Sequence, residues 1–95
     1  MIKSFADKYT EALFNDKSVL KWKNIEKVAR RKLNAIHFAT QLKDLTKPPR
    51  NRLEALKGEF KGKWSIRINK QYRVIFEWKK DNHAYEVEIS KHYEK

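Results

Sequence analysis

The pair Pro48-Pro49 divides the sequence into two halves whose apolar residues follow different periods. Two successive prolines remove two backbone donors and disfavour helical geometry just before them, so a helix is expected to end there. Upstream, apolar residues recur at helical spacing: Ile25, Val28, Ala29, Leu33 and Ile36. Downstream, apolar and polar residues alternate. The sequence therefore predicts helices first and strands last, which is an α+β order.

The first half is predicted to hold a short strand, a short helix and a long amphipathic helix. Residues 2–5 can form the strand, and Asp7 can open the helix that follows it. Segment 22–38 is predicted as one continuous helix, because its charged residues lie off the apolar face. His37 lies beside that face and is interpreted as a helix-surface residue, since no carboxylate or second histidine accompanies it as a metal site would require.

The second half is predicted to form three strands with a common apolar face. Residues of alternating polarity fill segments 64–68, 72–78 and 85–90. In the last segment Tyr85, Val87 and Ile89 are assigned to the apolar face. We expect an antiparallel meander covered by the helices on that face, a two-layer α+β fold in which residues 1–95 form one domain.

Positive charge is concentrated after the prolines. The chain carries a net charge of +11, and segment 47–73 holds nine basic residues against two acidic ones, a net +7. Such an excess raises the affinity and association rate for polyanions, above all nucleic acid. Two other interpretations stay open: a charge that only favours solubility, and an acidic protein partner.

Composition also restricts the chemistry and the location. There is no cysteine, so disulfides, thiolate metal sites and a thiol nucleophile are excluded. The first residues lack the apolar region of a signal peptide, and no segment approaches membrane-spanning length. We therefore expect a cytoplasmic protein without a membrane partner.

The face of the predicted sheet that the helices leave open carries reactive side chains. Arg67, Arg73 and Ser90 fall opposite the apolar residues, and His92 continues the series of Ser90. If the last two strands are neighbours, Arg73 and His92 can converge in one groove. An exposed strand arginine is usually solvated or in a surface ion pair, so the conjunction carries more weight than either residue alone.

Glu54 and Lys57 follow the prolines closely and are expected at the rim of that groove. Together these residues supply a carboxylate, an imidazole and guanidinium groups on a basic sheet. Cleavage of RNA at phosphate requires a base, an acid and cations that stabilise the phosphorane. Histidine has the ordinary pKa best suited to proton transfer near neutral pH.

The chain resembles the HigB branch of the RelE/ParE toxin superfamily in three stretches of its second half: NRLEALKG, GKWSIRINKQYRVIF and VEIS. The earlier stretches MIKSF, EALF and ARRKLNAIHFAT are similar to that branch too, so the resemblance covers nearly the whole chain. It implies a RelE-like two-layer fold, in which a short N-terminal strand and helices pack on one face of a small antiparallel sheet.

The resemblance also implies the toxin of a type II toxin–antitoxin pair, an mRNA endonuclease that depends on the ribosome and needs no metal or other cofactor. Such toxins enter the A site of a translating 70S ribosome, contact 16S ribosomal RNA and cut the codon by attack of the RNA's own 2′-OH. The implied partner is a HigA-like helix-turn-helix antitoxin, through which the pair reaches operator DNA.

On the family's pattern, Arg73 matches the arginine of the middle strand that binds the scissile phosphate. Arg67 and Lys57 occupy positions that are often basic and contact the RNA backbone. The expected set of RNA-contacting residues is completed by three further basic residues: Arg50, Arg52 and Lys91.

The general base and general acid are implied by a different branch. Glu54 stands where some HigB proteins have histidine, but where the related YoeB toxins carry a glutamate thought to be the general base. Lys91-His92-Tyr93 aligns with the Asp-Tyr-His ending of many HigB chains, yet its order is similar to the His-Tyr ending of YoeB. The resemblance thus implies His92 as acid and Tyr93 as a residue that stacks on or orients a base, with core packing open for Tyr93.

Two other functions remain as alternatives. A ParE-like gyrase poison would share the fold but lack chemistry between Arg73 and His92. A non-catalytic RNA- or ribosome-binding protein would rely on charge and on aromatic residues such as Tyr72 and Trp78, although both share the apolar parity. Only the nuclease would create new RNA 5′ ends in cells.

Overall fold

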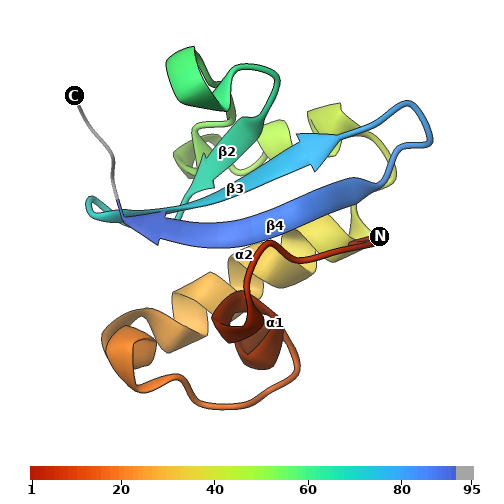
Figure 1. Ribbon diagram of the computed structural model, residues 1–95. Coiled ribbons are helices and arrows are strands. Elements are labelled where there is room, and N and C mark those ends of the chain that lie inside the picture. Colours follow the sequence, from red (N-terminus) through yellow and green to blue (C-terminus); the bar gives the residue numbers. More distant parts are fainter. Residues whose placement is uncertain (92–95) are drawn as a thin grey trace.

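The computed structural model describes residues 1–91 and confirms the α+β fold, with helices on one face of a four-stranded antiparallel sheet (Figure 1). The strands lie in the order β1-β2-β3-β4. In chain order the elements are α1 (Lys8–Phe14), η1 (Leu20–Ile25), α2 (Glu26–Phe38), η2 (Leu42–Thr46), η3 (Pro49–Asn51), β1 (Glu54–Ala55), η4 (Gly58–Phe60), β2 (Trp64–Arg67), β3 (Tyr72–Trp78) and β4 (Ala84–Lys91), where η denotes a 3-10 helix. Among residues 1–91, no helix is long and apolar enough to span a membrane.

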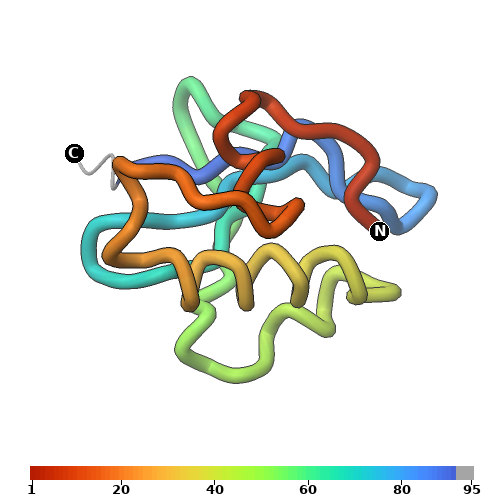
Figure 2. Tube along the Cα trace, turned by 90° about the horizontal axis from the view of Figure 1, so that it is seen from below, coloured from red at the N-terminus to blue at the C-terminus, as the bar shows by residue number. Residues whose placement is uncertain are grey.

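The core lies between α2 and the sheet, as the two hydrophobic periods predict. The stripe of α2 formed by Ala29, Leu33 and Ile36 is completely buried. It belongs to the same apolar cluster as buried residues of the three longer strands: Ile66, Val74, Phe76, Val87 and Ile89. Figure 2, seen from the helical side, shows α2 running across the strands. Helix α2 thus covers one face of the sheet, and the opposite face is not covered by this helix.

The prediction of one continuous helix over 22–38 is wrong at its beginning. Trp22 departs from helical geometry (φ −115°, ψ 19°) inside η1, and α2 begins only at Glu26. The 3-10 turn buries both Trp22 and Ile25. Apolar spacing could not reveal the break, because residues three apart share a face in both kinds of helix.

The predicted alternation in the last strand is wrong at Tyr85. Tyr85 pairs with Glu77, but Glu88 pairs with Ile75, so β4 holds one more residue than β3 between these pairs. Glu86 lies in this bulge with a positive φ of 51°. A bulge reverses the parity on one side of it, so Tyr85 leaves the face of the core while Val87 and Ile89 remain buried there.

The N-terminal segment runs beside β4 through two isolated parallel bridges, Ile2 to Ala84 and Phe5 to Val87, rather than as a full strand. His37, near the end of α2, accepts a hydrogen bond on Nδ1 from the backbone N–H of Ile2 at 3.1 Å. Burial and then the nearby N-terminal charge lower the pKa of His37. His37 is therefore half-buried and helps to fasten this segment to α2.

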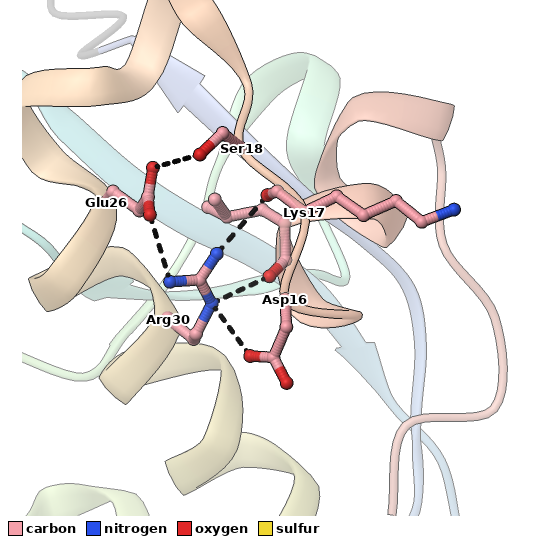
Figure 3. A network of polar contacts seen from close by, with 6 residues as sticks. Asp16, Lys17, Ser18, Glu26 and Arg30 are labelled. Atoms are coloured by element: carbon pink, nitrogen blue, oxygen red, sulfur yellow. Dashed lines mark hydrogen bonds and ion pairs between the residues drawn. The ribbon is translucent and has the colours of Figure 1, made fainter.

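Arg30 of α2 ties the turn after α1 to the helix (Figure 3). Its Nε donates to the carbonyl of Leu13 at 2.9 Å, and its Nη2 donates to the carbonyl of Lys17 at 3.3 Å. Its guanidinium also forms ion pairs with Asp16 and Glu26, each at 3.3 Å. The carbonyl bonds matter most, since Asp16 is highly exposed and its ion pair is screened by water.

Replacing Arg30 with methionine is expected to lower the free energy of unfolding by about 1–3 kcal/mol, because two carbonyls and a carboxylate lose a shared charged donor. Urea unfolding of the wild type and the variant measures this loss. Lys27→Met, at an exposed position of the same helix, is the matched control and should change stability by less than about 0.5 kcal/mol. Equal effects of the two substitutions would show that the Arg30 contacts contribute nothing specific.

Candidate functional site

The face of the sheet away from α2, which we call the open face, carries polar residues in register. Arg67 pairs with Arg73 and Arg73 pairs with Ser90, so these residues form one row across β2, β3 and β4. In the next row Glu54 of β1 pairs with Ser65 of β2. Directly paired residues share a face, so the predicted parity of Arg67, Arg73 and Ser90 is confirmed.

Arg73 is buried in this face, whereas the sequence had suggested an exposed strand arginine. Only 7% of its surface is accessible. Its Nε donates to Ser65 Oγ at 2.8 Å, and its Nη2 donates to the carbonyl of Arg52 at 3.1 Å and to Glu54 Oε1 at 2.9 Å. Its ion-pair partner is therefore Glu54 rather than a glutamate of β4. Three acceptors from three segments fix the plane of the guanidinium.

The remaining guanidinium nitrogen of Arg73, Nη1, donates no hydrogen bond to any residue within 1–91. Arg73 borders a hollow of about 260 Å³ that we call the cationic pocket, lined by Arg52, Arg67, Asn69, Lys70 and Arg73. Four of its five lining residues are cations, so the pocket is suited to an anion such as phosphate.

Arg52 and Glu54 follow Asn51, a buried residue whose hydrogen bonds fix the backbone before them. Asn51 is almost completely inaccessible, and its Nδ2 donates to the carbonyls of Leu45 and Lys47, both at 3.1 Å. Lys32 of α2 donates its Nζ to Asn51 Oδ1. Arg52 follows in left-handed geometry with φ 47°, which turns its carbonyl toward Arg73. Asn51 therefore links Lys32 of α2 to the segment that supplies two of the acceptors of Arg73.

The structure does not bring every sequence-predicted residue to the cationic pocket. Lys57 is exposed at the start of η4, and Arg50 is exposed in η3; neither lines the pocket. Lys91 pairs with Tyr72 and so shares the face opposite Arg73. His92 and Tyr93 lie outside the residues that the structure describes.

Sequence reasoning missed Ser65, Asn69 and Lys70 as parts of this site. Ser65 has open-face parity and could have been assigned by counting from Arg67. Asn69 and Lys70 sit at the interruption between the two alternating runs, the signal of a turn, and that turn closes one side of the pocket. Their assignment requires the fold, because parity does not extend through a turn.

Glu88 is a second carboxylate of the open face, on the strand beside Arg73. It pairs with Ile75, which is completely buried although it lies on the open face. Burial raises the pKa of Glu88, while the charge of Lys63 opposes that rise. Figure 1 shows the segment between β1 and β2 on this side of the sheet, away from α1 and α2.

Among residues 1–91, no group of three or more metal-ligating side chains is placed to hold a metal ion.

Fold and pocket together define a small α+β protein with a cationic pocket on the open face of its sheet. The family described as the RelE-like toxin of the type II toxin–antitoxin system HigB matches residues 3–92, nearly the whole sequence. The chain therefore belongs to the HigB-like toxins of the RelE superfamily, as the sequence stretches had indicated.

Two relatives have similar sequences. Toxin HigB-1 of Vibrio cholerae serotype O1 is 44% identical over 80 residues, which cover 82% of this chain and 84% of that protein. An uncharacterized protein of Haemophilus influenzae is 44% identical over 55 residues, covering 58% of this chain and 54% of that protein.

Two solved structures share the fold, and both are toxin–antitoxin complexes. A chain of the YoeB-YefM complex from Staphylococcus aureus has a TM-score of 0.60 at 23% identity and covers 100% of this chain and 97% of that one. A heterotetrameric YoeB-YefM complex from the same organism gives 0.59 at 20% identity, covering 99% and 97%. At such identities the likeness concerns the fold alone.

Glu88→Gln is expected to stabilise the protein near neutral pH and to flatten its pH dependence. Because the pKa of Glu88 is higher in the folded than in the unfolded state, the folded state binds more protons. Stability is therefore lost as the pH rises from the unfolded value of 4.5 through the folded pKa, and the loss persists above it. Thermal unfolding of both proteins between about pH 4 and pH 8 measures the difference.

The control for loss of one negative charge is Glu59→Gln at an exposed position of η4. An equal gain at neutral pH from both substitutions would contradict a burial effect at Glu88 and would point to net charge instead.

Proposed function

We propose that this toxin is a metal-independent mRNA endoribonuclease, which cuts codons in the A site of the translating ribosome and so inhibits translation. The observation that carries the proposal is the Arg73 guanidinium: three acceptors hold it in place, and Arg73 lines the cationic pocket. A preorganised cation stabilises charge that develops on phosphate at no cost of reorganisation.

The reaction follows from attack within the RNA. Glu54 removes the proton of a 2′-OH, the 2′ oxygen attacks the adjacent phosphorus, and Arg73 stabilises the phosphorane. The bond to the 5′ oxygen then breaks, and a general acid protonates that oxygen. The products are a 2′,3′-cyclic phosphate and a 5′-OH. Glu54 suits the role of base because about half of its side chain is exposed, although it touches Arg73.

The remaining roles rest on the sequence resemblance. His92 is proposed as the acid and Tyr93 as the residue that stacks on or orients a base. Arg52 and Arg67, which line the cationic pocket, would hold flanking phosphates. Lys57, Arg50 and Lys91 would contact RNA farther from the scissile bond.

Membership of the family supports an antitoxin as partner, and the similar solved structures are themselves toxin–antitoxin complexes. We propose a HigA-like helix-turn-helix antitoxin, which would also connect the toxin to operator DNA. The other partners would be the 70S ribosome, with contacts to 16S ribosomal RNA, and its mRNA. Action on translating ribosomes would place the protein in the cytoplasm.

Arg73→Ala is expected to reduce cleavage of mRNA on purified translating ribosomes by on the order of 10²–10³-fold, as loss of one preorganised donor to a transition-state oxyanion does. Single-turnover rates at saturating toxin measure this. Lys79→Ala removes one cation from an exposed position after β3 and should leave the rate unchanged. Wild-type cleavage by Arg73→Ala would remove the proposed role, whereas no cleavage by the wild type would favour the non-catalytic binder.

Glu54→Gln and His92→Gln should each slow single-turnover cleavage by about 10²–10⁴-fold, the usual contribution of a general base or acid. Toxin binding to ribosomes should persist, because neither substitution removes a cation of the pocket. If one variant cleaves at the wild-type rate, that residue has no part in proton transfer.

A further inference from the structure

Among residues 1–91, Lys32 is the one buried lysine, and it lies on α2, across the sheet from the open face. Its Nζ donates to Asn51 Oδ1, and it forms no ion pair with an acidic residue within that range. Loss of solvation on burial is the main cause that lowers the pKa of Lys32. A buried cation whose hydrogen-bond partner is a neutral amide costs free energy of folding. An apolar side chain of similar length would avoid that cost, so stability does not explain the lysine.

The lysine determines which way the amide group of Asn51 faces. An ammonium group can only donate hydrogen bonds, so Oδ1 of Asn51 must face Lys32. Nδ2 then faces the carbonyls of Leu45 and Lys47, and it donates to both at 3.1 Å. Asn51 is 1% exposed, so water cannot replace these partners. Three hydrogen bonds of fixed direction therefore hold Asn51 in one orientation.

The backbone after Asn51 connects this orientation to Arg73. Arg52 follows directly in left-handed geometry, which is strained for a residue with a side chain and persists only where its surroundings fix it. The carbonyl of Arg52 and Oε1 of Glu54 both accept from Nη2 of Arg73, at 3.1 and 2.9 Å. Because both acceptors closely follow Asn51 in the chain, a shift of Asn51 would displace both of them.

We propose that Lys32 and Asn51 are positioning residues for RNA cleavage, which act through Arg73 and do not themselves contact RNA. The proposal rests on the proposed function of Arg73 and extends it to the far side of the sheet. By holding both acceptors of Nη2, the two residues keep the guanidinium in the plane in which it meets the phosphorane. A preorganised charge loses effect when it must reorient, and a displacement of about 1 Å can cost about 10²-fold in rate.

The test replaces Lys32 with methionine, which keeps the length of the side chain and removes the donor. Arg30→Met is the matched control, because Arg30 lies on the same helix and its loss destabilises the turn after α1 without reaching Arg73. Asn51→Asp is a second variant of nearly unchanged size, which keeps an acceptor for Lys32 but loses both bonds donated by Nδ2. Urea unfolding gives the folded fraction of each variant, so that rates refer to folded protein.

Lys32→Met and Asn51→Asp should each lower the maximal single-turnover rate on translating ribosomes by on the order of 10–10²-fold. The toxin concentration that gives half of the maximal rate should change by less than about threefold, because the cations of the pocket remain and only transition-state stabilisation is lost. Arg30→Met should cleave at the wild-type rate per folded molecule.

Nuclear magnetic resonance follows Arg73 without any RNA. In ¹H–¹⁵N spectra of the wild type, the Nη2 protons of Arg73 should give resolved signals, because two acceptors slow rotation about the bond between Cζ and Nη2. These signals should broaden or merge in Lys32→Met and in Asn51→Asp but not in Arg30→Met. The Nε signal should persist in every variant, since Ser65 still accepts from it.

Three results would overturn the proposal: a wild-type rate in Lys32→Met or Asn51→Asp, an equal loss of rate in Arg30→Met, or slow cleavage with unchanged Arg73 signals. The second result would show that stability alone controls the rate, and the third that the effect does not pass through Arg73. If the wild type itself cuts no RNA, the proposed function fails, whereas the spectra still decide whether Lys32 and Asn51 position Arg73.

Discussion

The site depends on one constraint, which is that the buried guanidinium of Arg73 must find acceptors. A buried cation is costly unless it is paired and hydrogen-bonded. Here the acceptors come from β2, from β1 and from the carbonyl of Arg52. The strand register and the turn at η3 must therefore both be correct before this arginine is held. The fold is thus organised around the same residue that is proposed to bind phosphate.

Much of the fold could be predicted from the sequence because its signals are periodic. The change of period at Pro48-Pro49 separates helices from strands, and parity alone places Arg67 and Arg73 on the open face. The failures occur where a residue breaks the period locally. Trp22 leaves helical geometry, and the bulge at Glu86 reverses the parity of Tyr85. Neither break leaves a mark in composition or spacing.

The burial of Arg73 was beyond sequence reasoning for a different reason. Its partners are 8, 19 and 21 residues away in the chain, and one of them is a backbone carbonyl with no side-chain identity. The alternation of polar and apolar residues indicated on which face of the sheet Arg73 lies, but not how deeply its side chain is buried. The buried link from Lys32 to Asn51 likewise joins residues from different elements.

The chemistry of the RNA ends produced in cells tests the central claim most directly. Sequencing of 5′-hydroxyl ends after induction of the wild type should reveal new ends inside translated coding regions, and induction of Arg73→Ala should not. Attack by the RNA's own 2′-OH leaves a 5′-OH rather than a 5′-phosphate. Three results would contradict RNA cleavage that depends on Arg73: new ends bearing 5′-phosphate, the same new ends after induction of Arg73→Ala, or no new ends at all.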